Sequence, residues 1–215
     1  MSETDTSAAL DRPKRRAIVE AAARLFMRDG YGAVSMDAVA RESGVSKATL
    51  YAHFSGKDRL FATIVAERCA GLQAECEADP DWQAQDLRTA LTSMGRRWLG
   101  FLMSPATIAI YRVVTAEAVR FPELAAAFYD SGPRPIKEWL TAWIAAQARA
   151  GRLDAPDPLV AAEQFIALLR TGAFFRATLG VGTPPGEIER RVVVDQAVGT
   201  FLRAFAPAGT RRTEG

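Results

Sequence analysis

Two short helices joined by a tight turn are predicted between Ser35 and Lys57, where the chain reads SMDAVARESGVSKATLYAHFSGK. Ser35 suits the N-cap of the first helix, because a serine hydroxyl can accept a hydrogen bond from a backbone N–H of the first turn. Gly44 then interrupts the helical pattern where a tight turn needs a residue that tolerates positive φ. Ser46 suits the N-cap of the second helix. This spacing predicts a helix-turn-helix, a motif whose second helix enters the DNA major groove.

The polar side chains of the second helix suit contact with DNA. Lys47 can donate to guanine and the methyl group of Thr49 can touch thymine, whereas the small Ala48 lets the backbone approach the bases. The other polar groups of this segment are expected at phosphate reach, where they position the protein without reading sequence. The expected DNA-binding residues are Ser35, Ser46, Lys47, Ala48, Thr49, Tyr51, His53 and Lys57.

Positive charge is concentrated around the same segment. Residues 12–59 hold ten Lys or Arg and five Asp or Glu, a net charge of +5, in a chain whose total net charge is +2. A basic N-terminal part on a near-neutral remainder fits phosphate contact at one end. Residues 14–16 are either part of this contact or a solvated helix start, and both alternatives stay open.

The rest of the chain has helical periodicity and no convincing strand. With 49% hydrophobic and 24% charged residues, it has ample material for a packed core. Residues 192–194 are three valines, but the apolar positions around them keep helical spacing over a longer window. We expect an all-α protein of about nine or ten helices, one of which runs unbroken over residues 159–179.

The run GVSKATLYAHFSGKDRLF, from Gly44 to Phe61, resembles the signature of TetR-family transcriptional regulators, and residues 16–68 resemble the DNA-binding domain of that family. The part from about Tyr111, with the sequence EAVRFPELAAAFYDSGP, resembles the AefR-like subgroup of C-terminal domains. The resemblance implies an all-α homodimer that binds a double-stranded, pseudo-palindromic DNA operator and usually represses transcription.

Matched by position, the family's phosphate contacts fall on Tyr51, His53 and Lys57, and its base-reading positions fall on residues 47–49. Asp37 stands where some family members place a basic residue. We expect a disordered arm over residues 1–11, a helix-turn-helix domain over 12–60, a ligand-binding and dimerisation domain over 61–206, and a flexible tail over 207–215.

Large apolar side chains on the central helices suit either an ordinary core or an apolar pocket with a few polar groups. The resemblance favours a pocket for a small-molecule effector of unknown identity. Its expected lining residues are Trp98, Phe101, Tyr111, Arg112, Phe128, Trp139 and Trp143.

The helices expected over residues 159–179 and 187–205 are apolar around most of their circumference, which favours burial on more than one side. Pairing them with their copies in a second chain would form a four-helix interface. The expected dimer residues are Phe165, Leu169, Gly172, Phe175, Val198, Phe201 and Phe205.

Other classes of protein have little support in the sequence. The chain has one histidine and two cysteines, and it has neither a nucleophile motif nor a phosphate-binding glycine loop, so we expect no cofactor, no metal site and no enzyme. The alternatives are a helical ligand-binding or interaction module without DNA binding, or an all-α enzyme.

We find no signal peptide and no run of 18 apolar residues, so we expect no membrane contact and a cytoplasmic location. On one helix, Cys69 and Cys76 would be separated by about 10 Å, too far for a disulfide. The two thiols are therefore either buried apolar groups or a redox sensor.

Overall fold

The computed structural model describes residues 3–82 and 86–207, and within these ranges every regular element is an α-helix, which confirms the all-α prediction. Two compact units are formed. The first comprises the described residues up to Arg68 together with Ala109–Gly132, and the second comprises Cys69–Ile108 together with the described residues from Pro133 onward. The helices in the described ranges are α1 (Glu3–Asp29), α2 (Met36–Ser43), α3 (Lys47–His53), α4 (Lys57–Glu77), α5 (Leu87–Leu102), α6 (Pro105–Glu117), α7 (Pro122–Ser131), α8 (Pro133–Arg149), α9 (Pro158–Leu169), α10 (Gly172–Leu179) and α11 (Glu187–Phe205).

Helix α1 begins earlier than the sequence predicts. The arm expected over residues 1–11 lies within this helix from Glu3 onward, and Pro13 stands inside it. Proline lacks a backbone N–H and removes one hydrogen bond from the helix. Residues Ala8–Leu10 have high helix propensity, which favours continuation of the helix on the N-terminal side of the proline.

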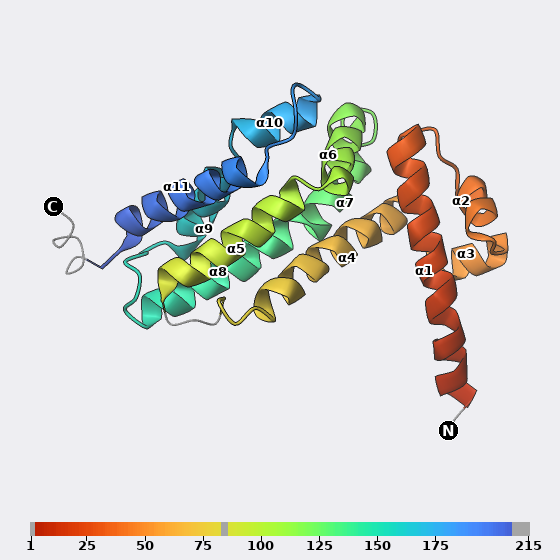
Figure 1. Ribbon diagram of the computed structural model, residues 1–215. Coiled ribbons are helices and arrows are strands. Elements are labelled where there is room, and N and C mark those ends of the chain that lie inside the picture. The colour runs from red at the N-terminus through yellow and green to blue at the C-terminus, as the bar shows by residue number, and fades with distance from the viewer. Residues whose placement is uncertain (1–2, 83–85, 208–215) are drawn as a thin grey trace. The chain divides into compact units, whose positions relative to one another are not determined.

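Aromatic rings form the centre of the first unit. α1 packs against α2 and α3 (Figure 1). The rings of Phe26, Tyr31 and Phe61 contact one another pairwise, with centroids 5.4 to 5.9 Å apart. Phe121, which precedes α7, contacts Tyr31 edge-on at 5.3 Å. Because edge-to-face ring pairs add to the free energy gained from burial, the cluster fixes the loop between α1 and α2 against the start of α4.

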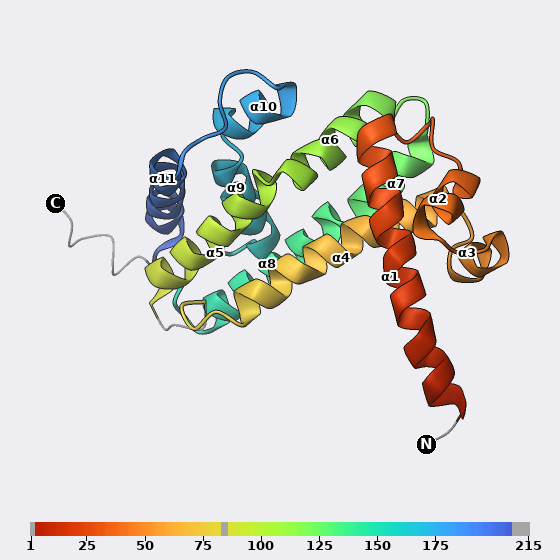
Figure 2. The ribbon, with the colours of Figure 1, turned by 45° about the vertical axis from the view of Figure 1, so that its right-hand side comes forward.

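The second unit is built around α9 and α11. α9 packs against α8 and α11, and α5 packs against α11 (Figure 2). A Cβ atom on Gly95 would lie 3.0 Å from a methyl group of Val194, so a side chain here would require that methyl group to shift by a few tenths of an ångström. Trp82 stacks on Trp139 and Trp143 with ring centroids 5.0 and 4.5 Å apart.

The apolar stretch over residues 159–179, predicted as one helix, is divided in the structure. α9 ends at Leu169 and α10 begins at Gly172. Arg170 has φ −88° and ψ 63°, outside the helical region, and Thr171 is extended. Threonine and glycine have low helix propensity, and here that local preference outweighs the continuous apolar pattern.

Cys69 and Cys76 are both buried, and neither forms a disulfide. Burial raises the pKa of the Cys76 thiol to about 11, so this thiol is protonated at neutral pH. Because the thiolate is the reactive form, this environment favours the first of the two roles considered above for Cys76, a buried apolar group.

Three features expected from the sequence cannot be compared with the structure: one helix start, the C-terminal tail and the boundary between the two domains. The start of the helix expected at Gln83 lies outside the described residues, as does the tail expected over 207–215 apart from Pro207. The division at residues 60 and 61 stays a prediction.

In the described part of the chain, no single helix is long and apolar enough to span a membrane; α5 and α6 pass that test only as a pair bent by 60°.

Candidate nucleic-acid interface

The turn between α2 and α3 has the predicted caps. The Ser35 hydroxyl oxygen accepts a hydrogen bond from the Ala38 backbone N–H at 3.1 Å, and the Ser46 hydroxyl oxygen accepts one from the Thr49 N–H at 3.1 Å. Gly44 lies between the two helices with φ 69°, in the left-handed region that favours glycine. These residues end one helix and start the next within a few positions, and so they set the direction of α3.

Gly44→Ala should lower the free energy of unfolding by about 1–2 kcal/mol, because an L side chain is strained in the left-handed region. A Cβ atom at this position meets no other atom within 4 Å, so the conformational cost is isolated from any clash. Gly44→Asn is the matched control, because asparagine tolerates this conformation and should cost less. Urea unfolding checks both variants, and equal stabilities of Gly44→Ala and the parent protein would contradict the argument.

The start of α3 presents the side chains expected to read bases. Lys47 and Ala48 are exposed and Thr49 is half-buried. The Lys47 ammonium forms an ion pair with the Asp37 carboxylate on α2, with Nζ 2.6 Å from Oδ2. Both side chains stay largely exposed, and such surface pairs contribute about 1 kcal/mol at most. Lys47 can therefore exchange this partner for DNA, and Asp37 is a local competitor that sequence reasoning did not identify.

The Ser46 hydroxyl is engaged within the helix cap. Besides accepting from the Thr49 backbone, its oxygen lies 2.9 Å from the Thr49 hydroxyl oxygen. Phosphate contact at this position is therefore better suited to the free backbone N–H groups at the start of α3 than to the hydroxyl itself.

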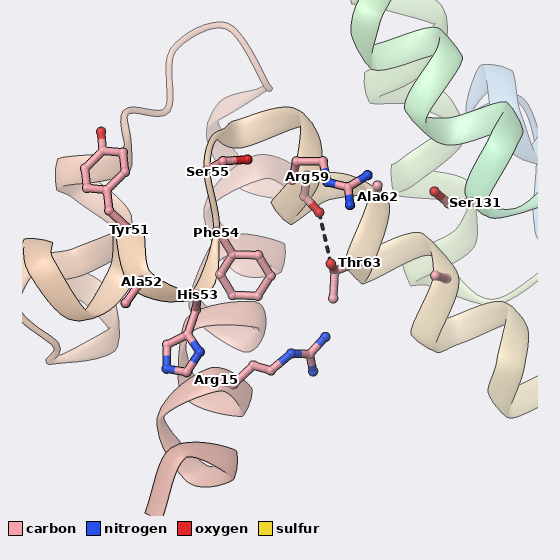
Figure 3. A pocket seen from close by; sticks show the side chains of 11 residues that line it. Arg15, Tyr51, Ala52, His53, Phe54, Ser55, Arg59, Ala62, Thr63 and Ser131 are labelled. Atoms are coloured by element: carbon pink, nitrogen blue, oxygen red, sulfur yellow. Dashed lines mark hydrogen bonds between the residues drawn. The ribbon is translucent and has the colours of Figure 1, made fainter. Parts of the chain in front are cut away.

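Tyr51 and His53 project in opposite directions from the end of α3 (Figure 3). Tyr51 is 52% exposed. A groove of about 570 Å³ lies beside this end of the helix, and its lining includes Arg15 of α1 and Arg59 of α4 as well as His53. Two guanidinium groups and an imidazole suit a phosphate backbone. Sequence reasoning missed Arg59, although its place two positions after Lys57 was a usable signal.

Lys57 lies in a different environment from the other expected contacts. Its ammonium donates a hydrogen bond to the Tyr31 backbone carbonyl at 2.9 Å. Burial is the main cause that lowers the pKa of Lys57 below its ordinary value. Burial also raises the pKa of the neighbouring Tyr31 hydroxyl to about 12. The ammonium is thus directed into the first unit, and its contact with phosphate stays a prediction.

The expected pocket residues fall in both units. Trp98, Phe101, Trp139 and Trp143 belong to the second unit, whereas Tyr111, Arg112 and Phe128 belong to the first. In the first, the rings of Tyr111 and Phe128 meet edge-on with centroids 5.2 Å apart. In the second, the Trp139 indole donates to the Glu77 carboxylate at 2.9 Å, and the buried Trp98 indole N–H has no partner among the described residues. The pocket itself stays a prediction.

The expected dimer residues are mostly interior. Four of them are at most 1% exposed because α9 packs between α8 and α11 of the same chain: Phe165, Leu169, Val198 and Phe201. Gly172 and Phe175 are exposed, and Phe205 is half-buried. The outer face of α9 and α11 has a groove of about 370 Å³, lined by Ala167, Leu168 and Ala204 among others.

Two family models match the chain. Residues 18–64 match the model described as bacterial regulatory proteins of the tetR family. Residues 89–207 match the model described as the C-terminal domain of AefR-like transcriptional repressors. Together the two matched segments cover most of the chain.

Solved structures and curated proteins agree with these matches. The flavonoid-responsive regulator FrrA is 34% identical and superimposes with a TM-score of 0.76, covering 91% of this chain and 98% of that one. A TetR-family regulator from Mesorhizobium loti is 25% identical, with a TM-score of 0.79 and the same coverage. The transcriptional activator FasR of Mycolicibacterium smegmatis is 42% identical over 57 residues, 26% of each chain. The regulator SrpR of Pseudomonas putida is 31% identical over 65 residues, so these two curated relatives are matched over less than a third of their length.

Proposed function

The chain belongs to the TetR family of transcriptional regulators, and from this premise we propose that it represses transcription by binding a pseudo-palindromic DNA operator, from which a small, largely apolar effector releases it. The observation that carries the proposal is the exposed start of α3, where Lys47 and Ala48 face solvent directly after the turn at Gly44 and the Ser46 cap. A regulator of this kind acts on the chromosome, so we place it in the cytoplasm.

The proposed DNA contacts divide into two groups. Lys47, Ala48 and Thr49 read bases, whereas the phosphate backbone is met by the turn at Ser46 and by the groove that contains His53. So few base contacts in a half-site give limited specificity, and a two-fold dimer offsets this by placing two copies of α3 about 34–36 Å apart in successive major grooves.

The proposed class of effector is supported by one similar solved structure and by one side chain of this protein. FrrA is described as responsive to flavonoids, which are planar aromatic compounds with oxygen acceptors. In this chain the buried Trp98 indole N–H has no partner among the residues that the structure describes, and an unpaired buried donor costs about 1–3 kcal/mol. An effector with an aromatic body and an acceptor oxygen would satisfy that donor.

The proposal is tested by measuring affinity with fluorescence anisotropy, using duplexes whose sequences are taken from the DNA that flanks the protein's own gene. Lys47→Ala should weaken the preferred duplex by about 1–3 kcal/mol and relax base preference at one position. Tyr51→Phe should weaken preferred and random duplexes by the same factor, because a phosphate contact carries no sequence information. Arg149→Ala at the end of α8 is the control.

A flavonoid added to the complex should release the preferred duplex if the effector class is right. Lys47→Ala and Tyr51→Phe affinities equal to that of the parent protein would instead contradict the assigned surface. If the parent protein binds none of the duplexes even at low salt, the alternative of a helical module without DNA binding is favoured.

An enzyme on this scaffold has no supporting observation. Among the described residues, no group of three or more His, Cys, Asp or Glu side chains could hold a metal ion. Turnover of an effector by the purified protein would be needed to revive that alternative.

A further inference from the structure

Lys57 begins α4, and its ammonium occupies a corner of the first unit. Nζ lies 2.9 Å from the Tyr31 carbonyl oxygen. The same atom lies 4.6 Å from the centroid of the Tyr31 ring and 5.7 Å from the centroid of the Phe121 ring. One N–H is thus used by a carbonyl, and two aromatic faces lie against the charge, which is the geometry of a cation–π contact.

Glu117 and Phe121 build the far side of this corner. The Glu117 carboxylate, at the end of α6, accepts a hydrogen bond from the Gly32 backbone N–H at 2.8 Å. A Cβ atom on Gly32 would lie 2.7 Å from that carboxylate and 3.0 Å from the Phe121 ring, so a side chain at residue 32 would require both groups to shift. The loop from Gly30 to Val34 is therefore held against the segment that joins α6 and α7, and the Tyr31 carbonyl is held where Lys57 meets it.

We propose that Phe121 and Glu117 are positioning residues that hold the Lys57 ammonium in this corner, and that a backbone phosphate of DNA competes with the corner for the same ammonium. The carbonyl uses one of the three N–H donors of the ammonium, and a phosphate that draws Nζ toward itself weakens the contacts with the two rings and the carbonyl. The corner therefore lowers affinity for every DNA sequence and sets how strongly the protein binds without changing what it reads. This inference rests on the proposed DNA-binding function.

The test uses a random-sequence 30-bp duplex at low salt, so that no operator needs to be known. Phe121→Leu removes a ring from the corner and should tighten binding about three- to tenfold, the ratio that corresponds to losing a competing cation–π contact. In the Lys57→Met background the same substitution should leave affinity unchanged, because no ammonium remains to be released. Tyr129→Leu, an exposed aromatic residue on α7, is the matched control and should have no effect in either background.

Two further measurements separate this role from general support of the fold. Lys57→Met should reduce the slope of log affinity against log salt concentration by about one, as loss of a single phosphate contact does. Glu117→Gln keeps an acceptor for the Gly32 N–H but removes the negative charge near the ammonium. It should tighten DNA binding about two- to threefold, a smaller effect than that of Phe121→Leu. If Phe121→Leu does not fold by circular dichroism, Glu117→Gln tested in both backgrounds replaces it.

Equal tightening with and without Lys57, or no tightening at all, would overturn the inference, as would an unchanged salt slope in Lys57→Met. Failure of the parent protein to bind any duplex at low salt would instead contradict the proposed function, and the two failures are thus distinguishable.

Discussion

Phe61→Ala should lower the free energy of unfolding by about 3–5 kcal/mol, the cost of removing a fully buried phenyl ring and leaving a cavity. Phe61 is 0% exposed, and its ring contacts Phe26 and Tyr31 at the centre of the aromatic cluster. For a chain of this length the loss corresponds to a drop in Tm of roughly 6–20 °C. Thermal and urea unfolding followed by circular dichroism measure it.

Tyr129→Ala is the matched control, because Tyr129 is 48% exposed and belongs to the same unit. A surface substitution of this kind should change stability by no more than about 0.5 kcal/mol. DNA retention by Phe61→Ala should fall with its folded fraction, so binding lost at 37 °C should return at lower temperature. Similar stabilities of Phe61→Ala and Tyr129→Ala would show that the cluster does not hold the unit together.

The local features of α2 and α3 were predictable because their signals lie within a few residues. A serine hydroxyl at an N-cap can reach only the first turn of its own helix, and glycine at a left-handed position is required by that one residue's φ. Ser35, Gly44 and Ser46 accordingly stand in the predicted roles. The break at Thr171 was also local, but the continuous apolar pattern around it concealed the low helix propensity of Thr171 and Gly172.

The environment of Lys57 was not predictable, because its partners are distant in sequence. The Tyr31 carbonyl lies 26 residues earlier, and the carboxylate that holds the adjoining loop lies 85 residues after Gly32. No periodicity or motif links such positions, and a resemblance transfers a role to Lys57 without its partners in the unbound protein. Lys57, which the resemblance matches to a phosphate contact, is therefore held by the Tyr31 carbonyl in the unbound protein.

Burial of the C-terminal helices was predictable, but their neighbours were not. An apolar circumference requires contact on several sides, and the pattern does not say whether the contacts come from the same chain or from a copy. In the structure, neighbouring helices of the same chain surround Phe165 and Phe201, whereas smaller side chains such as Ala167 and Ala204 line the outer groove. Those smaller side chains are the ones to test.

Ala167→Glu should convert the proposed dimer to a monomer and lower operator affinity by about 10²- to 10⁴-fold, the advantage of two linked half-site contacts over one. Ala167 is exposed on α9 and lines the apolar groove beside Phe201. A two-fold interface over this groove would contain both introduced carboxylates, and burying unpaired charges costs several kcal/mol. Light scattering measures the mass, and anisotropy measures operator affinity.

Ala146→Glu on α8 is the control, because it adds the same charge at another exposed alanine of the same unit. It should leave the mass and the operator affinity unchanged. Ala167→Glu should keep its fold and its weak, salt-dependent binding of random duplex, since each monomer retains its own α3 and its own phosphate contacts. A dimer that survives Ala167→Glu with unchanged operator affinity would place the interface on a different face, because an interface over this groove would have to bury two unpaired carboxylates.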